Sequence, residues 1–145
     1  MLKLPMFFFA IALLTGCQTG EEALITNSTP NTVTGSAASA IAGDLASRFA
    51  EQIGSPATTT IKLDKGETEY AIALEKAFKG WGYTVTSESK TTKNERPLEV
   101  AYSIDAFDGE ILARLTTPSI ALARTYTQTA DSATPASPLS VMRHN

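Results

Sequence analysis

The chain has 145 residues, a formal net charge of −3, a single cysteine and a single histidine. This length is enough for one domain and no more. The mildly acidic balance supplies no basic field that would attract a nucleic acid. One cysteine cannot form a disulfide within the chain, and one histidine and one cysteine cannot build a metal site of the usual ligand spacing. We therefore expect no nucleic acid partner, no metal and no cofactor.

Residues 1–16 read MLKLPMFFFAIALLTG and have the features of an export leader. One charge at Lys3 is followed by an apolar run of about eleven residues, which suits a signal peptide and is shorter than the roughly 20 residues of a spanning helix. The tetrad LTGC that ends at Cys17 resembles the bacterial lipobox. That resemblance implies that residues 1–16 are a signal peptide and that Cys17 is lipidated after cleavage.

The residues after Cys17 indicate where the protein is attached. Gln18 stands where inner-membrane lipoproteins usually have aspartate, so the resemblance implies a lipid anchor in the outer membrane, with the protein facing the periplasm. Several acyl chains on one residue would make that attachment stable. Residues 17–37 are rich in Thr, Ser, Asn and Gly, a composition that predicts a flexible tether.

Hydrophobic periodicity predicts two helices. Residues 38–53 place apolar side chains on one stripe, with Ser36 or Ser39 as the expected cap and Gly54 after the end. Residues 66–81 form a second such pattern. Its shared face comprises Tyr70, Leu74, Ala77, Phe78 and Trp81.

Alternating apolar residues predict strands between and after these helices. Short strands are expected within residues 57–64 and 83–89. Asp108-Gly109 is a preferred type I′ turn, so the alternating segments on either side of it, LEVAYSIDAF and EILARLTT, are expected to form a hairpin. The segment IALARTYTQT supplies the third strand of a meander, with Leu122, Arg124 and Tyr126 on one face.

This order of elements predicts an α+β fold, with two helices packed on one face of a small, mostly antiparallel sheet. The expected periplasmic domain covers residues 38–129. Residues 130–145 return to Ala, Ser and Pro and are predicted to be a disordered tail.

Residue patterns for catalysis are weak. His144 lies second from the end of the sequence, where a side chain is poorly fixed for general-base chemistry. The carboxylates around the hairpin occupy positions that outward strand faces and a turn also require; they are Glu99, Asp105, Asp108 and Glu110. We expect a protein that is not an enzyme. Trp81, Tyr83 and Tyr102 leave open an alternative, a small pocket for a ligand or a cell-wall fragment, although Trp81 and Tyr102 at this spacing favour core positions.

Several phrases together resemble the TrbH family of conjugal transfer lipoproteins. They are the helix end and strand at Gly80 to Val85, the Tyr-x-Ile-Asp at Tyr102 to Asp105, and the Arg-x-Tyr at Arg124 and Tyr126, combined with the lipobox and a polar tether. The resemblance implies a structural role in mating-pair formation, at the outer-membrane part of a type IV secretion channel. It implies no catalytic residues.

Two short apolar islands are candidates for binding ring-forming channel proteins. Leu24 and Ile25 interrupt the polar tether, and Leu139 to Met142, which includes Val141, interrupts the tail. Either island, or an edge strand of the sheet, could lie along a partner by strand addition. The partner-binding role of these residues is predicted from composition alone.

Overall fold

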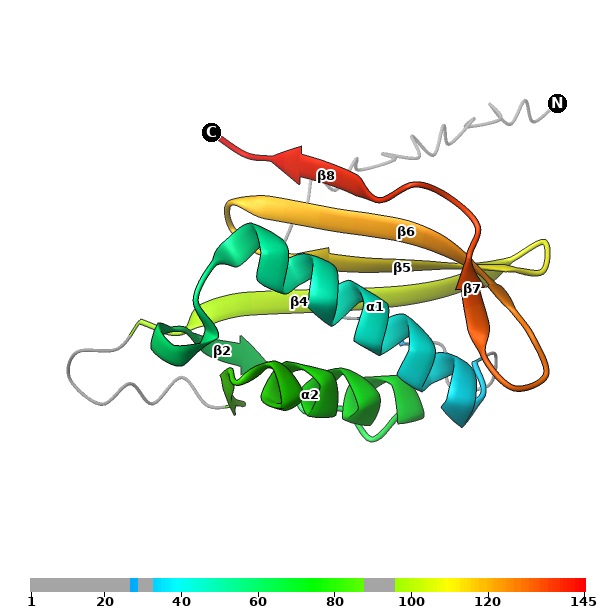
Figure 1. Cartoon of the computed structure of the whole chain (residues 1–145), viewed down its shortest axis with the longest axis horizontal. Coiled ribbons are helices and arrows are strands. Elements are labelled where there is room, and N and C mark those ends of the chain that lie inside the picture. The colour runs from blue at the N-terminus through cyan, green and yellow to red at the C-terminus, as the bar shows by residue number, and fades with distance from the viewer. Residues whose placement is uncertain (1–26, 29–32, 88–95) are drawn as a thin grey trace, which may run out of the picture.

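The computed structural model describes residues 27–28, 33–87 and 96–145, with two helices on one face of a mixed sheet (Figure 1). The predicted α+β fold is confirmed. In chain order the elements are β1 (Asn27–Ser28), α1 (Gly35–Ile53), the 3-10 helix η1 (Pro56–Thr58), β2 (Thr60–Leu63), α2 (Glu69–Trp81), β3 (Thr84–Thr86), β4 (Leu98–Phe107), β5 (Glu110–Thr116), β6 (Ile120–Gln128), β7 (Ala133–Pro135) and β8 (Ser140–Arg143).

Helix α1 begins earlier than its apolar stripe predicted. Thr34 is the N-cap, and its hydroxyl oxygen accepts from the Ala37 N–H at 3.4 Å, so neither Ser36 nor Ser39 caps the helix. The helix therefore includes residues 35–37, for which the composition predicts a tether, and Ala37 is buried in the core. Gly54 ends the helix with φ of 99°, as expected. Residues 17–26 and 29–32 of the predicted tether lie outside the described residues.

Helix α2 runs between Thr68, whose hydroxyl accepts from the Ala71 N–H, and Gly82, which has a left-handed φ of 100°. Tyr70, Leu74 and Phe78 are buried as predicted. The preference for a core position at Trp81 is wrong, because its side chain is 48% exposed. Trp81 is the last residue of the helix, and Tyr83 packs instead against the rings of Phe49 and Phe78.

The predicted hairpin is present. Asp108 and Gly109 have φ of 47° and 77°, so both central residues have the positive φ that a type I′ turn requires. Phe107 pairs with Glu110 across the turn, and the antiparallel ladder continues to Ala101 opposite Thr116. The turn dipeptide therefore sets the register that places Ile104 and Ala113 on the helix-covered face.

The sheet has a central antiparallel meander of β4, β5 and β6. Two short strands pair with the outer side of β4, and two others pair with the outer side of β6. β2 and β1 pair in parallel with successive parts of β4, and β3 pairs in parallel with β2. On the other side, β8 and β7 pair antiparallel with the first and last parts of β6. The four pairings that involve β5 or β6 are antiparallel, as predicted for most of the sheet.

The prediction of a disordered tail is wrong for the two parts of it that form strands. Residues 133–135 form β7 and residues 140–143 form β8, both on the free side of β6. Residues 130–145 contain few apolar residues, because a strand at the edge of a sheet needs few buried side chains. Pro135 is tolerated at such an edge, since a proline lacks the N–H that a central strand must donate.

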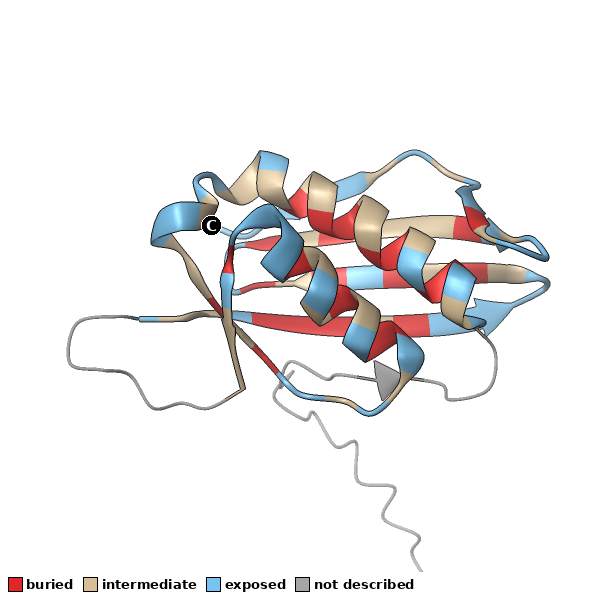
Figure 2. Cartoon of the chain, turned by 60° about the horizontal axis from the view of Figure 1, so that its bottom comes forward, coloured by how far each residue is buried: buried red, intermediate tan, exposed pale blue. Residues whose placement is uncertain are grey.

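The core lies between the helices and the sheet. Figure 2 shows the buried positions of both helices turned toward the strands, and the central strands carry buried residues on the same side. Phe49, Phe78 and Tyr83 form edge-to-face ring pairs within this layer. Among the described residues, no helix is long and apolar enough to cross a membrane.

Candidate partner-binding edge

Three of the residues singled out by the sequence lie outside the described part of the chain. They are the expected lipidation site Cys17 and the apolar pair Leu24 and Ile25. Their roles stay predictions. The described chain starts at Asn27, which pairs with Ser103 of β4.

The second apolar island is divided by the structure. Leu139 is partly buried and packs against the hydrophobic core, whereas Val141 and Met142 lie on β8 and are 38% and 58% exposed. Leu139 therefore fixes the chain where it enters β8. The surface of the island that is available for contact consists mainly of Val141 and Met142.

The register of β8 determines which of its backbone groups are used within the domain. Ile120 pairs with Arg143 and Ala121 with Met142, and the His144 N–H donates to the Ser119 carbonyl at 2.9 Å. In an antiparallel ladder the bonded and non-bonded pairs alternate. The backbone of Met142 is therefore bonded to β6, while the N–H and C=O of Val141 and Arg143 point away from it. Among the described residues, no strand other than β6 pairs with β8.

Side chains on β8 also alternate between the two faces of the sheet. Arg143 lies on the helix-covered side, where its Nη2 donates to Oε1 of Gln52 in α1 at 2.8 Å. Val141 is on the same side, opposite the buried Leu122, and Met142 is on the other side, opposite Ala121. An apolar side chain is thus exposed on each side of this edge.

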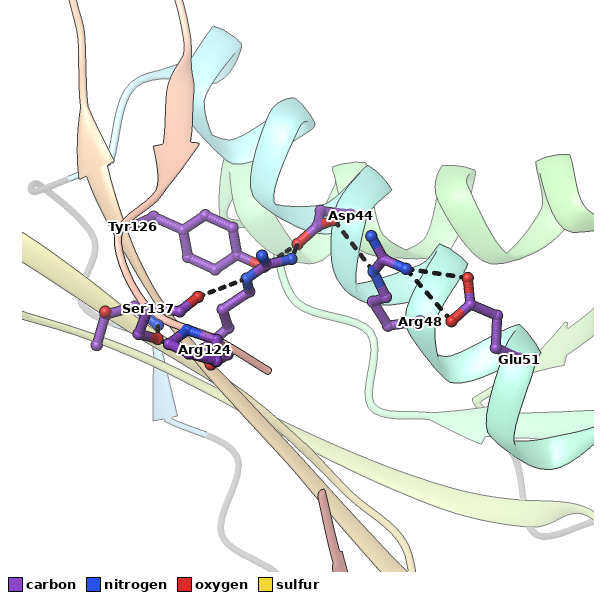
Figure 3. A network of polar contacts seen from close by, with 8 residues as sticks. Asp44, Arg48, Glu51, Arg124, Tyr126 and Ser137 are labelled. Atoms are coloured by element: carbon purple, nitrogen blue, oxygen red, sulfur yellow. Dashed lines mark hydrogen bonds and ion pairs between the residues drawn. The ribbon is translucent and has the colours of Figure 1, made fainter. Parts of the chain in front are cut away.

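A polar network joins α1 to β6 (Figure 3). Oδ2 of Asp44 accepts from Nη1 of Arg124 at 2.9 Å and from the hydroxyl of Tyr126 at 2.8 Å. The Arg124 and Asp44 side chains are only 17% and 23% exposed, so the pair is largely removed from water. A half-buried cation is stable there because the carboxylate and further acceptors satisfy it.

The same arginine holds the connection between β7 and β8. Nε of Arg124 donates to the Ser137 carbonyl at 2.9 Å, and the Ser137 hydroxyl accepts from the Thr125 N–H at 3.0 Å. The Ala136 N–H donates to the Thr125 carbonyl at 2.8 Å. These bonds attach the chain to β6 at the point where β7 ends and before β8 begins, so the position of β8 depends on them.

Burial raises the pKa of Tyr126 above its ordinary value, and the hydrogen bond to Asp44 raises it further. The phenol is consequently a neutral donor to the carboxylate over the whole physiological range. The sequence contained one signal for this network, since Arg124 shares a face with Leu122 and Tyr126. Asp44, which lies 80 positions earlier, was not identified.

The aromatic residues considered for a ligand pocket do not form one group. Tyr102 is buried, as its strand position favoured, and its ring packs edge-to-face on Tyr70, while its hydroxyl donates to the Asp64 carbonyl at 3.5 Å. Tyr83 is buried too, and its hydroxyl donates to the Gly54 carbonyl at 3.3 Å. The rings of these two tyrosines thus belong to the core, and their hydroxyls bond to the loops that cover it.

The carboxylates near the hairpin are dispersed. Glu99 forms an ion pair with Lys62 of β2 at 3.3 Å, Asp105 is exposed on β4, and Asp108 occupies the turn. His144 is exposed, and its backbone N–H continues the β8 ladder. Within the part of the chain that the structure describes, no cluster of three or more His, Cys, Asp or Glu residues could hold a metal ion.

Comparisons with known proteins give a consistent result. Residues 19–145 match the family model described as conjugal transfer protein TrbH. A protein of Sinorhizobium fredii (strain NBRC 101917 / NGR234), described as a probable conjugal transfer protein TrbH, is 59% identical over 148 residues, which cover all of both chains. No solved structure matches this chain.

Proposed function

Because the chain belongs to the TrbH family of conjugal transfer proteins, we propose that it is a lipid-anchored structural component of the mating-pair formation apparatus. The observation that carries this proposal is the family match over residues 19–145, which begins two residues after the candidate lipidation site, Cys17. The protein would face the periplasm from the outer membrane and contact other channel proteins there.

The proposed anchor limits how far the domain can lie from the membrane. From Cys17 to Asn27, the first residue paired with the sheet, a fully extended chain spans at most about 35 Å. Several acyl chains on Cys17 would make attachment stable, whereas a single chain gives only marginal binding. Copies held this close to one surface would bind a ring-shaped partner with added avidity.

We propose a role in assembly rather than in catalysis. Of the polar groups described above, the half-buried Asp44 and Arg124 are bonded to each other and hold structural elements together. The ligand-binding alternative has less support, because two of the three residues expected to line its pocket, Tyr83 and Tyr102, are core residues, and only Trp81 is exposed.

The test is a conjugation assay in donor cells that lack this gene. Complementation with the intact gene is expected to restore DNA transfer, and Cys17→Ser is expected not to restore it. Gln18→Ser, one position away, is the matched control and should restore transfer. Normal transfer without the gene would contradict the proposed function.

A second variant separates loss of the anchor from failed export. Residues 18–145 placed behind a signal peptide without a lipobox would be released into the periplasm in soluble form. We expect this protein to accumulate and still fail to support transfer. If it supports transfer at the wild-type level, the lipid anchor is not part of the mechanism.

A further inference from the structure

We propose that the outer edge of β8 binds an extended, acidic segment of another transfer protein, which adds to the sheet as a further strand. This inference rests on the proposed function, since it takes the partner to be a component of the same apparatus.

The backbone of β8 supplies the hydrogen bonds. The alternation set by the Ile120–Arg143 and Leu122–Val141 pairs turns the N–H and C=O groups of Val141 and Arg143 away from β6. A strand laid beside β8 would satisfy both residues, as in other complexes formed by strand addition. The neighbouring edge of β7 is less suitable because Pro135 has no N–H to donate.

Exposed apolar side chains would add to this backbone pairing. Val141 lies on the helix-covered side of the sheet and Met142 on the opposite side, and both are substantially exposed. An added strand would cover part of each, because its own side chains also alternate between the two faces.

Charge determines what kind of strand fits. The Arg143 guanidinium is bonded to the uncharged amide oxygen of Gln52, and among the described residues it forms no ion pair with a carboxylate. Glu51, which precedes Gln52 in the sequence, is paired with Arg48 at 3.1 Å. An Asp or Glu opposite Arg143 would therefore gain a charge-assisted contact.

A second copy of this chain is a poorer fit. β8 carries Ser140, Val141, Met142 and Arg143 and no carboxylate, so self-pairing would bring a second arginine to the edge without neutralising the first. Like charges brought together on adjacent strands are destabilising. These observations favour an acidic segment of a different protein.

A proline substitution tests the backbone contact, with DNA transfer from donor cells as the measurement. Val141→Pro removes an outward N–H and leaves the ladder to β6 in place, because proline is tolerated at an open strand edge. We expect transfer to fall at least about tenfold, since a partner carbonyl loses its donor. Val141→Ala keeps the N–H and is the matched control, with a smaller loss. Wild-type transfer by Val141→Pro at normal protein level would overturn the proposal.

Charge reversal and cross-linking identify the partner segment. Arg143→Glu should reduce transfer, and Arg143→Lys should retain most of it. A photoactivatable residue at position 142 in the full chain should cross-link to an Asp- or Glu-containing segment of another transfer protein. Replacing that acidic residue with Lys should restore transfer to Arg143→Glu. A cross-link to a second copy, or no rescue by the reversed pair, would contradict the inference.

These outcomes are distinct from failure of the proposed function. If deletion of the gene leaves transfer intact, both the role in conjugation and the edge contact are wrong. If deletion abolishes transfer but Val141→Pro and Arg143→Glu support it fully, the edge inference alone is wrong.

Discussion

β5 and β8 belong to the same sheet but are held in place by different interactions. In β5, Ile111, Ala113 and Leu115 are buried, and both neighbours of the strand are long antiparallel partners. In β8 all four residues are exposed, and among the described residues the strand is paired on one side only, with β6. Burial thus fixes the centre of the sheet, whereas backbone bonds and the attachment at Ser137 fix the edge. Substitutions at the edge can therefore change binding with little loss of stability.

The largest expected effect is in the core that covers the centre of the sheet. Phe49 is fully buried and contacts the rings of Phe78 and Tyr83. Phe49→Ala should lower the free energy of unfolding by about 3–5 kcal/mol, because it removes a large apolar side chain and leaves a cavity. Urea denaturation of the purified chain measures this. A loss below about 1 kcal/mol would mean that α1 does not pack against α2 and Tyr83 as described.

An intermediate effect is expected at the network that connects centre and edge. Arg124→Ala should cost about 1–3 kcal/mol, because it leaves the half-buried Asp44 with one donor fewer and frees the Ser137 carbonyl. A double-mutant cycle with Asp44→Ala should show coupling between the two sites. If the two substitutions have additive effects on unfolding, the ion pair contributes nothing.

A smaller, pH-dependent effect is expected from the tyrosines. Burial is the main cause that raises the pKa of Tyr70, Tyr83, Tyr102 and Tyr126 above the ordinary value of 10.0. Since the pKa is higher in the folded state, the stabilising contribution is complete below pH 10.0 and is lost as the pH rises above it.

The measurement is the free energy of unfolding between neutral and alkaline pH, together with tyrosinate absorbance. Tyr126→Phe should cost about 1 kcal/mol at neutral pH and make the alkaline decline shallower. If tyrosinate appeared near pH 10.0 while the chain remained folded, these side chains would not be buried as described.

The sequence predicted features that depend on local patterns. The Asp108-Gly109 turn, the Gly54 helix end and the alternation along β4 to β6 follow from neighbouring residues, and the structure confirms them. Each of these requires only the conformational preference of a short segment or a period of two.

Features that depend on distant residues were not predicted. β8 has no buried side chain, so nothing in its composition distinguishes an edge strand from a disordered segment. Its position comes from backbone pairing to β6 and from Arg124 holding Ser137. Asp44 is a charged residue in an amphipathic helix, a pattern that predicts a solvent-exposed side chain. Its partner Arg124 lies on β6, which is distant in the sequence.

Residue-resolved amide hydrogen exchange of the isolated chain tests the central claim about the edge most directly. The account predicts slow exchange for Met142 and His144, whose amides donate to β6, and fast exchange for Val141 and Arg143, whose amides point outward. Slow exchange at all of these amides would mean that the edge is already covered. Fast exchange at all of them would mean that β8 is not formed, and either result would contradict the account.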